Sequence, residues 1–411
     1  MRLLFLFTLS VFILSATTAF ARQELGASKE EADVNVGCLF PLSGYGVRFG
    51  NDSSVGIKLA LEDIEKNIPN PPKIRVLIED TKLKASKAIR HVRDYVKNDK
   101  TKFICGIVSS SIALEVTKII EDLGVIFIGT DNASSRLTGS ALSPNYYRLT
   151  NNTLQTMYAG AKYIRDNFQD ILTKRPLRIA FIGPDYDYGY QSWIDFQNVM
   201  KELDIPYEAV ATVWPNLFEV DFTPYIQSLK KSRPDLIVDE HWGDDFITFL
   251  RQGDDNNLFK HSRIANFGSG GDFDVLAEMK DKMPLGLILS ARHHVNWPDT
   301  TENKDFVSRF YKEAGHYPSY VGEGAYSGIM AIAHAIVASK GSLEIKDLKS
   351  ALDNVKLKLP EDPEGFMSYM NPKTHQIQQV ISIGETVPDT RFSPAARMLG
   401  NWHYYLPETK Q

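Results

Sequence analysis

The sequence predicts an α/β protein built of two lobes, each organised around a mainly parallel β-sheet. Short apolar runs alternate along the chain with amphipathic stretches of helical spacing, an alternation typical of βαβ crossover units. Two successive runs share this rhythm although their residues differ. The length of 411 residues fits two or three domains at roughly 100–200 residues each. We therefore expect two lobes, and we place the crossings between them near residues 149–152 and 294–299.

The first run follows a polar leader at residues 22–32, for which we expect a helix or disorder. Residues 35–40 form a continuous apolar strand of the kind that is buried on both faces. A glycine-rich turn follows at residues 41–51, and Ser53 or Ser54 is the expected N-cap of the next helix. The strands of this run are expected at 35–40, 74–78, 103–108 and 125–128, and its helices at 54–66, 84–97 and 112–123.

The second run has the same pattern, and three further helices follow it. We expect the helix that begins at residue 246 to stop at Gly253. The expected strands are 178–182, 208–214, 236–239, 264–267 and 285–290, and the expected helices are 154–168, 191–203, 225–231, 246–252, 305–314, 322–339 and 345–352. These elements assign residues 33–149 plus 296–374 to a first lobe and residues 150–295 plus 375–411 to a second.

Residues 1–21 have the pattern of a secretory signal peptide. Arg2 supplies a positive start, residues 3–14 are an apolar stretch, and Ala19 and Ala21 form a small-x-small cleavage site. The apolar stretch is shorter than the roughly 20 residues that a membrane-spanning helix needs, which disfavours the alternative of a retained anchor. We expect a protein exported to the periplasm.

The composition argues against several classes of function. Lys and Arg number 46 against 51 Asp and Glu, for a net charge of −5, and no dense basic block occurs, so nucleic acid is not an expected partner. Two cysteines exclude a disulfide scaffold and a Cys-based zinc ribbon. Cys38 and Cys105 both fall on predicted strands, and we favour two free buried thiols over a disulfide, although export leaves pairing open.

The ends of the predicted strands mark where a ligand is expected. In parallel sheets, ligands bind beyond the carboxyl ends of the strands, near helix N-termini. The segments at these positions carry hydroxyl groups, glycines, aromatic rings and a few carboxylates, which suits a small polar molecule. They are residues 43–49, 79–81, 109–111, 130–133, 184–190, 240–245 and 269–272.

Two features of these segments bear on the chemistry of the ligand. Ser109 to Ser111 end a strand and open a helix, where free amide and hydroxyl groups form an anion pocket suited to a carboxylate. Helix capping is the alternative role for these serines. Aromatic rings in strand-end segments, which include Phe49, Tyr186, Tyr188 and Trp242, can stack on an organic ligand.

Motifs for cofactors, metals and catalysis do not fit. Gly44, Gly46 and Gly50 resemble a dinucleotide fingerprint, but three residues separate the last two glycines where the fingerprint has two. His293 and His294 are neighbours, and strand neighbours point to opposite faces, so we favour a surface or hinge role over a metal site. The sequence holds no G-x-S-x-G elbow, HExxH pair or P-loop. We expect no cofactor, no metal and no enzymatic activity.

Gly37 to Ile64 resemble the opening of the Leu/Ile/Val-type substrate-binding proteins of ABC transporters. Supporting stretches follow in the same order, so that the resemblance covers nearly all of residues 33–385. These stretches are 107–116, 183–193, 213–238, 241–252 and 371–379. The resemblance implies a type I periplasmic-binding fold, with two Rossmann-like lobes, three hinge strands and a ligand trapped between the lobes. It also implies an inner-membrane ABC permease as a partner, and we expect a monomer.

The resemblance assigns site residues position by position. A serine after the third strand takes the ligand carboxylate in this family, and its match is Ser110. The next strand-end loop, which supplies backbone and hydroxyl contacts, matches Asp131 to Ala133 and so includes Asn132. A second-lobe tyrosine that precedes a glycine matches Tyr188, and the aromatic residue of the opening loop matches Phe49.

Two departures from the family pattern weaken an amino acid as the ligand. Ala133 stands where the family has a threonine, and Gly270 stands where it has the glutamate that pairs with the α-ammonium group. A buried ammonium needs a compensating carboxylate, for which Asp131 and Asp272 are substitutes away from the family position. An aromatic or other organic carboxylate fits about as well, with His241 as a positive partner for the anion.

Together these observations predict a non-enzymatic capture protein that closes over a small organic solute and presents it to a permease. A ligand-sensing receptor with the same fold is the alternative, and an exported α/β enzyme would need a nucleophile–base pair at the strand ends. The candidate ligand-binding residues are Phe49, Ser109, Ser110, Asp131, Asn132, Tyr188, His241, Trp242, Gly270 and Asp272.

Overall fold

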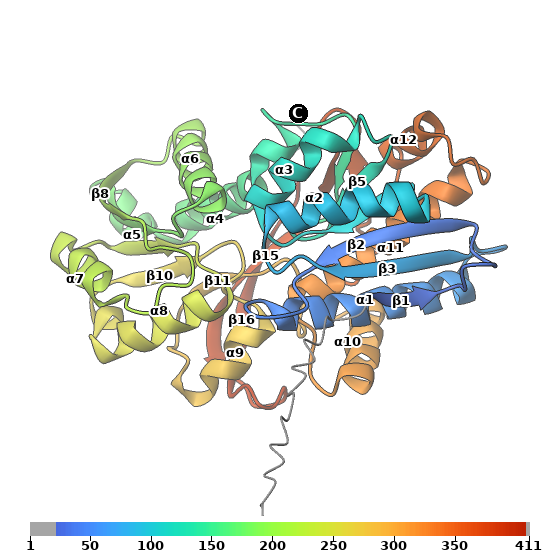
Figure 1. Ribbon diagram of the computed structural model, residues 1–411. Coiled ribbons are helices and arrows are strands. Elements are labelled where there is room, and N and C mark those ends of the chain that lie inside the picture. Colours follow the sequence, from blue (N-terminus) through green and yellow to red (C-terminus); the bar gives the residue numbers. More distant parts are fainter. Residues whose placement is uncertain (1–21, 408–411) are drawn as a thin grey trace, which may run out of the picture.

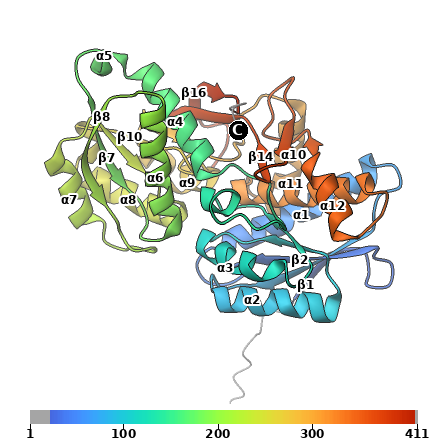
Figure 2. The same cartoon turned by 90° about the horizontal axis from the view of Figure 1, so that it is seen from above.

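The computed structural model describes residues 22–407, and these residues form two α/β lobes (Figures 1 and 2). Within them, a nine-stranded sheet organises the first lobe and a seven-stranded sheet organises the second. The central strands of both sheets pair in parallel, and helices pack on both faces. The predicted two-lobed, mainly parallel α/β fold is confirmed. The predicted signal peptide, residues 1–21, lies outside the described residues.

The first sheet has the strand order β1-β3-β2-β4-β5-β6-β14-β13-β12, with antiparallel pairing only at its two edges. Its strands are β1 Gln23–Gly26, β2 Val34–Phe40, β3 Ile74–Asp80, β4 Phe103–Gly106, β5 Ile126–Gly129, β6 Tyr146–Arg148, β12 Lys356–Leu357, β13 Ser368–Asn371 and β14 Gln376–Gln378. The helices of this lobe are α1 Val47–Asn67, α2 Ala85–Asp94, α3 Ser110–Ile120, α10 Thr301–Ala314, α11 Tyr320–Ala338 and α12 Ile345–Asp353.

The second sheet has the order β16-β15-β11-β10-β9-β7-β8, and β15 alone is reversed, since it pairs antiparallel with both of its neighbours, β11 and β16. Its strands are β7 Leu177–Ile182, β8 Tyr207–Val213, β9 Leu236–Asp239, β10 Arg263–Asn266, β11 Ile288–Ser290, β15 Ile381–Pro388 and β16 Arg397–Tyr405. Its helices are α4 Thr153–Asn167, α5 Gln169–Leu172, α6 Asp187–Glu202, α7 Thr223–Ser232, α8 Gly243–Asp255 and α9 Phe273–Met279.

The core of the first lobe depends on the close approach of α1 and α11. A Cβ atom on Gly56 of α1 would lie 1.9 Å from the carbonyl oxygen of Gly322, so only glycine permits this contact. Among residues 22–407, α11 is the one helix long and apolar enough to cross a membrane by composition, and 78% of that stretch is buried inside the lobe. Its apolar character is therefore accounted for by packing in the core.

The elements differ from the predictions mainly near the N-terminus and after residue 355. Part of the leader expected to be a helix or disordered forms β1, which pairs with β3. Helix α1 begins at Val47, after Gly46 in the left-handed region at φ 79°, and not at Ser54. The hydroxyls of Ser53 and Ser54 donate to the carbonyls of Phe49 and Gly50, so these serines lie inside the helix and do not cap it.

Other differences concern helix α8 and strands that were not predicted. Helix α8 continues past Gly253, which is buried against Phe259 and does not end the helix. Strands β6 and β12 to β16 were not predicted, although β14 and β15 carry the chain from one lobe to the other. A glycine inside a helix costs only about 1 kcal/mol relative to alanine, and the packing of Gly253 against Phe259 outweighs this cost.

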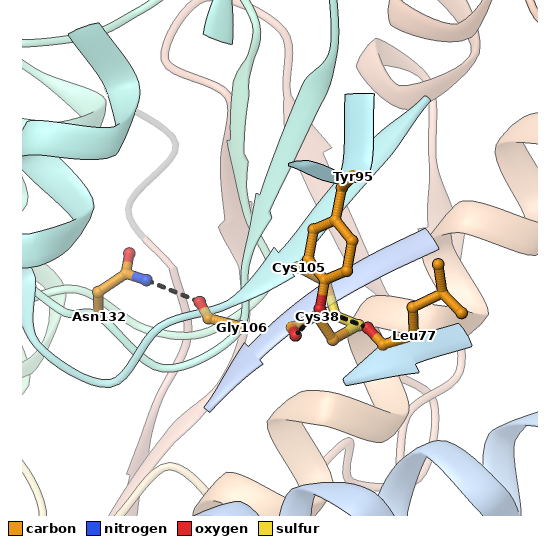
Figure 3. The surroundings of a disulfide bond; sticks show 6 residues. All are labelled: Cys38, Leu77, Tyr95, Cys105, Gly106 and Asn132. Carbon is orange, nitrogen blue, oxygen red and sulfur yellow. Dashed lines mark hydrogen bonds between the residues drawn. A yellow bond between two sulfur atoms is a disulfide. The ribbon is translucent and has the colours of Figure 1, made fainter. Parts of the chain in front are cut away.

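The two cysteines form a disulfide, so the prediction of two free thiols is wrong (Figure 3). Cys38 of β2 and Cys105 of β4 are register partners on neighbouring parallel strands, with Cα atoms 4.4 Å apart. The Tyr95 hydroxyl donates to the carbonyl oxygens of Cys38 (3.0 Å) and Leu77 (2.9 Å) beside the bridge. The strands were correctly predicted, but their adjacency in the sheet was not deducible from the order of elements alone.

The chain passes between the two sheets at residues 149–152, 291–300 and 379–380. The first two crossings lie where the turn-rich segments indicated. The third follows β14, because Gln376 pairs with Arg148 of β6 and this strand therefore belongs to the first sheet. The lobe boundary predicted after residue 374 therefore falls before the last strand of the first lobe, β14, which runs to Gln378.

Candidate functional site

A small cavity lies between the two lobes, at the carboxyl ends of strands from both sheets. The space open to the centre of a water molecule is ≈ 10 Å³, which is about the minimum for one water. Its wall combines five residues of the first lobe with five of the second. The lining residues are Val108, Ser110, Asp131, Ala133, Tyr186, Tyr188, Trp242, Ser269, Arg292 and Tyr320.

Ser110 occupies the first turn of α3, directly after β4, and its side chain is buried. Its Oγ accepts hydrogen bonds from the backbone N–H groups of Ala133 (3.2 Å) and Ser134 (3.1 Å). The hydroxyl therefore ties the loop after β5 to the start of α3 and still has its own hydrogen to donate. Ser109 is the half-buried residue before α3, makes no capping hydrogen bond, and does not line the cavity.

An ion pair crosses the cavity from one lobe to the other. Arg292, which follows β11, donates from Nη1 to Oδ1 of Asp131, which follows β5, at 2.6 Å. Both side chains are buried, and the Arg292 guanidinium lies 4.7 Å from the centre of the Tyr320 ring. Burial raises the pKa of Asp131 to about 7, against the opposing effect of Arg292. The pKa of Arg292 is raised above its ordinary value by Tyr320 and Asp131, although burial opposes this, so Arg292 keeps its charge.

Aromatic rings form the rest of the cavity wall and extend toward a larger hollow. Trp242 donates from Nε1 to the Tyr186 hydroxyl at 3.1 Å. Phe49 lies 5.8 Å from Trp242 and 6.0 Å from Tyr320 between ring centres, so it supports the wall from behind. Phe49 faces the hollow of ≈ 660 Å³ that opens between α1 and α8, and not the small cavity itself.

Tyr188 is fixed by a buried carboxyl group that the sequence-based prediction did not single out. Its hydroxyl donates to Oε2 of Glu240 at 2.9 Å, and the N–H of Phe267 donates to Oε1 of Glu240 at 3.1 Å. Burial raises the pKa of Glu240 to about 8, although both hydrogen bonds oppose the rise. Glu240 therefore carries a proton at neutral pH and positions Tyr188 without adding a full negative charge to the cavity.

Besides Ser109 and Phe49, four residues named as candidates lie outside the cavity wall. The Asn132 amide donates to the carbonyls of Gly106 (Figure 3) and Ile107, so it braces the loop, and it is not among the residues that line the cavity. His241 lies inside the second lobe, with Nδ1 2.9 Å from Oδ1 of Asp239. Its imidazole is thus not placed to meet an anion in the cavity.

Gly270 and Asp272 are the other two candidates that do not line the cavity. A Cβ on Gly270 would meet Asn266 and Phe246 inside the second lobe, so this position is not directed at the cavity. Matching it to the family glutamate therefore finds no ligand-facing residue. Asp272 accepts from the N–H of Tyr320 at 3.1 Å, which anchors the start of α11 across the lobe boundary, and burial raises its pKa to about 7.

Sequence reasoning missed Arg292 and Tyr320. Applying the strand-end rule to β11 as well finds Arg292, because this residue is the second after the end of that strand. Tyr320 opens α11 far along the chain and reaches the cavity only through packing, so no local signal marked it. Ser269 and Tyr186 lay within the strand-end segments that were predicted, but they were not among the final candidates.

The histidine pair after β11 is buried in the second crossing, so a surface role is wrong for it. His293 Nε2 lies 2.9 Å from Oδ1 of Asn303, and the N–H of Ala291 donates to Nε2 of His294. Burial lowers the pKa of His293 to about 4 and that of His294 to about 3, so both rings are neutral. In the part of the chain that the structure describes, no group of three or more His, Cys, Asp or Glu is placed to hold a metal ion.

Comparisons with known proteins agree with this architecture. The model of a family described as periplasmic binding protein matches residues 33–391. The Leu/Ile/Val-binding protein homolog 7 of Brucella abortus (strain 2308) is 24% identical over 355 residues, which cover 81% of this chain and 84% of that protein.

Two solved structures share the fold. The solute-binding protein of an ABC transporter from Rhodopseudomonas palustris BisB5, in complex with 3,4-dihydroxybenzoic acid, has a TM-score of 0.79 at 22% identity and covers 91% of this chain and 97% of that one. The Leu-, Ile-, Val-, Thr- and Ala-binding protein of Brucella ovis, in a closed conformation, has a TM-score of 0.78 at 20% identity. The match covers 91% of this chain and 95% of that one.

Proposed function

This chain belongs to the periplasmic binding protein family, and we propose that it is an exported capture protein that traps one small organic solute between its lobes. Its resemblance to the Leu/Ile/Val-type substrate-binding proteins of ABC transporters is confirmed by the family match and by the curated relatives. We further propose that the protein resides in the periplasm as a monomer and delivers the solute to an inner-membrane permease.

The observation that carries the proposal is the cavity at the strand ends of both lobes. Ser110 and Asp131 reach it from the first sheet, and Tyr188 and Trp242 reach it from the second. A solute bound there would contact both lobes at once, so its binding energy would favour the closed arrangement. Closure also excludes water, which strengthens each polar contact to the solute.

Two classes of solute agree with the site and with the neighbours. The R. palustris protein holds an aromatic acid, and the B. ovis protein is named for the amino acids that it binds. Hydroxyl donors such as Ser110 suit the carboxylate that both classes carry. The rings of Tyr186, Tyr188 and Trp242 suit a flat or branched apolar body. We propose an organic carboxylate or an amino acid as the solute, which is released chemically unchanged.

A thermal-shift panel tests this proposal. The panel contains branched, aromatic and acidic amino acids beside aromatic and aliphatic carboxylates, and each sample is assayed for solute loss after incubation. A solute at 100-fold excess over its dissociation constant should stabilise the protein by about 2.7 kcal/mol. A solute that stabilises the protein and is recovered intact supports the proposal. No stabilisation by any member, or conversion of the solute, would contradict it.

A further inference from the structure

Three buried polar atoms without a hydrogen-bond partner belong to residues that line the cavity. They are Nε of Arg292, Oγ of Ser269 and Oδ2 of Asp131. Their residues are only 7%, 1% and 3% exposed, so bulk water does not satisfy these atoms. A buried polar atom without a partner is unfavourable, and a bound group that pairs with all three is therefore strongly favoured.

Hydrogen-bond donors outnumber acceptors among the groups that face the cavity. Ser110 accepts two backbone N–H groups, and Tyr186 accepts from Trp242, so each hydroxyl has a hydrogen left to donate. With Arg292 and Ser269 they make four donors. Four donors match the lone-pair sites of one carboxylate group, whose two oxygens accept about four hydrogen bonds.

Acceptors for an ammonium group are scarce by comparison. Both oxygens of Glu240 already accept, from Tyr188 and Phe267. Oδ2 of Asp131 is the one unpartnered carboxylate oxygen among the described residues that line the cavity. An ammonium group has three N–H bonds to satisfy, whereas a hydroxyl group has one. The single acceptor thus fits a hydroxyl better than an ammonium.

The charge of the wall points the same way. Arg292 remains cationic, while burial raises the pKa of the nearby acids Asp131, Glu240 and Asp272 to about 7, 8 and 7. Near neutral pH the acids are thus partly or mostly protonated. The arginine is left with less than a full negative charge to balance it, which favours an anionic ligand group.

We propose that Arg292 is the anion receptor of the cleft and Asp131 its built-in counter-ion, so that the site selects a 2-hydroxy acid over the corresponding amino acid. The acid's carboxylate binds Arg292, Ser110 and Ser269, and its hydroxyl donates to Oδ2 of Asp131. The 2.6 Å hydrogen bond between Asp131 and Arg292 keeps their two binding groups close together, which suits a hydroxyl next to the carboxylate. This inference rests on the proposed function, since it names the solute of the same site.

Two matched sets of probes test the inference by isothermal titration with the full mature chain. The aromatic set is mandelate, phenylglycine and mandelamide, and the branched set is 2-hydroxyisocaproate, leucine and 2-hydroxyisocaproamide. Members of a set differ only in the hydroxyl, ammonium or amide group. We expect the hydroxy acid of at least one set to bind at least tenfold more tightly than both its partners. Equal or tighter binding of the amino acid or the amide in both sets would overturn the inference, as would binding of none of the six.

Variants of Arg292 and Asp131 test the roles of these residues as anion receptor and counter-ion. Arg292→Gln should weaken hydroxy-acid binding on the order of 100-fold, because it removes the charged partner of a buried carboxylate. Asp131→Asn removes the competing anion, and its amide N–H₂ can take the place of Oδ2 and donate to the ligand hydroxyl, which is able to accept. The hydroxy acid should therefore bind as tightly or several-fold more tightly, whereas an ammonium ligand, which cannot accept, would lose affinity. A loss of hydroxy-acid binding in Asp131→Asn that matches the loss in Arg292→Gln would overturn the counter-ion role.

Two controls keep the result interpretable. Arg75→Gln removes another buried arginine that pairs with a carboxylate, that of Glu24 at 2.7 Å, and it should leave the affinity unchanged. The double variant Asp131→Asn/Arg292→Gln leaves no unpaired charge, so it tests Arg292 even if the single variant fails to fold. A solute from the wider panel that binds equally well to this double variant would overturn the inference and leave the proposed function intact. Failure of every solute in that panel would instead contradict the proposed function.

Discussion

Ser110 shows how one hydroxyl group can serve both the fold and the site. It accepts two backbone N–H groups of the loop after β5, and that loop carries Asp131. Losing the acceptor would leave two buried donors unpaired and would release the loop that positions the ion pair. Capping is the alternative role for this segment, but no side chain caps α3, and Ser110 instead holds the loop after β5.

We predict that Ser110→Ala lowers both stability and affinity. The free energy of unfolding should fall by about 1–3 kcal/mol, because the N–H groups of Ala133 and Ser134 lose their partner. Affinity for a carboxylate solute should fall about tenfold with one charge-assisted hydrogen bond. Urea denaturation and isothermal titration measure the two effects. Ser111→Ala, one residue along α3 and outside the cavity wall, is the control, and equal effects of both variants would contradict the assignment.

Trp242 should govern the preference for aromatic solutes. Its ring lines the cavity and packs near Phe49, and its Nε1 orients the Tyr186 hydroxyl. Trp242→Ala should weaken an aromatic acid by about tenfold or more, because stacking adds to burial, and should weaken a short aliphatic acid less. Titration of both acids against both proteins measures the difference. An equal loss for the two acids would show that the ring only supports the wall.

A buried pair of acids near the third crossing should make stability depend on pH. Glu361 accepts from Gln379 in that crossing, and Glu323 accepts from Ser327. Burial raises the pKa of Glu323 to about 7 and that of Glu361 well above its ordinary value. A raised pKa in the folded state means that the stabilising effect is complete below about pH 4 and is lost as the pH rises toward 7.

The variant Glu323→Gln tests this dependence, because it is neutral at every pH. Its stability relative to the natural chain should improve as the pH rises from 5 to 7, by at most about 1.4 kcal/mol per pH unit. Urea denaturation at pH 5, 6 and 7 measures the trend. A difference that stays constant or reverses over this range would contradict a proton held by the pair.

At the scale of elements, the disulfide joins two central strands of the first sheet. Cys38 and Cys105 are separated by 67 residues in the sequence. Closing a loop of this size restricts the unfolded chain, so replacing both cysteines by alanine should cost about 2–4 kcal/mol. Thermal unfolding of the double variant measures the cost. Thiol titration of the denatured, unreduced protein should find no free thiol, and two thiols per chain would contradict the bond.

Two of the strands that were predicted from sequence share a physical signature that two of the missed strands lack. Strands β2 and β9 are buried along almost their whole length, so their apolar runs are continuous. Strand β1 is a four-residue edge strand whose residues are mostly exposed, and β16, at the edge of the other sheet, mixes buried, half-buried and exposed positions without a regular pattern. Such strands form because a neighbouring strand is present, and no local pattern reveals that neighbour.

At the scale of the whole molecule, contacts between the lobes explain why the site was only partly predictable. Strand-end loops identified Ser110, Asp131, Tyr188 and Trp242, because the carboxyl ends of parallel strands share one edge. Arg292 lies in a crossing segment, and its role depends on which loop faces it from the other lobe. Position in the sequence does not determine that pairing.

Several contacts besides the Arg292–Asp131 pair hold the lobes together. Tyr45 stacks on Phe218 with ring centres 4.3 Å apart. Arg48 forms an ion pair with Asp274, with Nη2 2.6 Å from Oδ1. These contacts surround the mouth of the cleft, whereas the ion pair lies inside it. A solute must therefore enter while the lobes are apart and be enclosed when these contacts form.

Hydrogen–deuterium exchange with mass spectrometry tests the enclosure of a solute most directly. The protein is compared with and without the solute that stabilises it most in the thermal-shift panel. We expect slower exchange at the start of α3 and in the loop after β5 in the first lobe, together with the start of α6 and the segment after β11 in the second. Protection confined to one lobe, or located away from these strand ends, would contradict a site formed between the lobes.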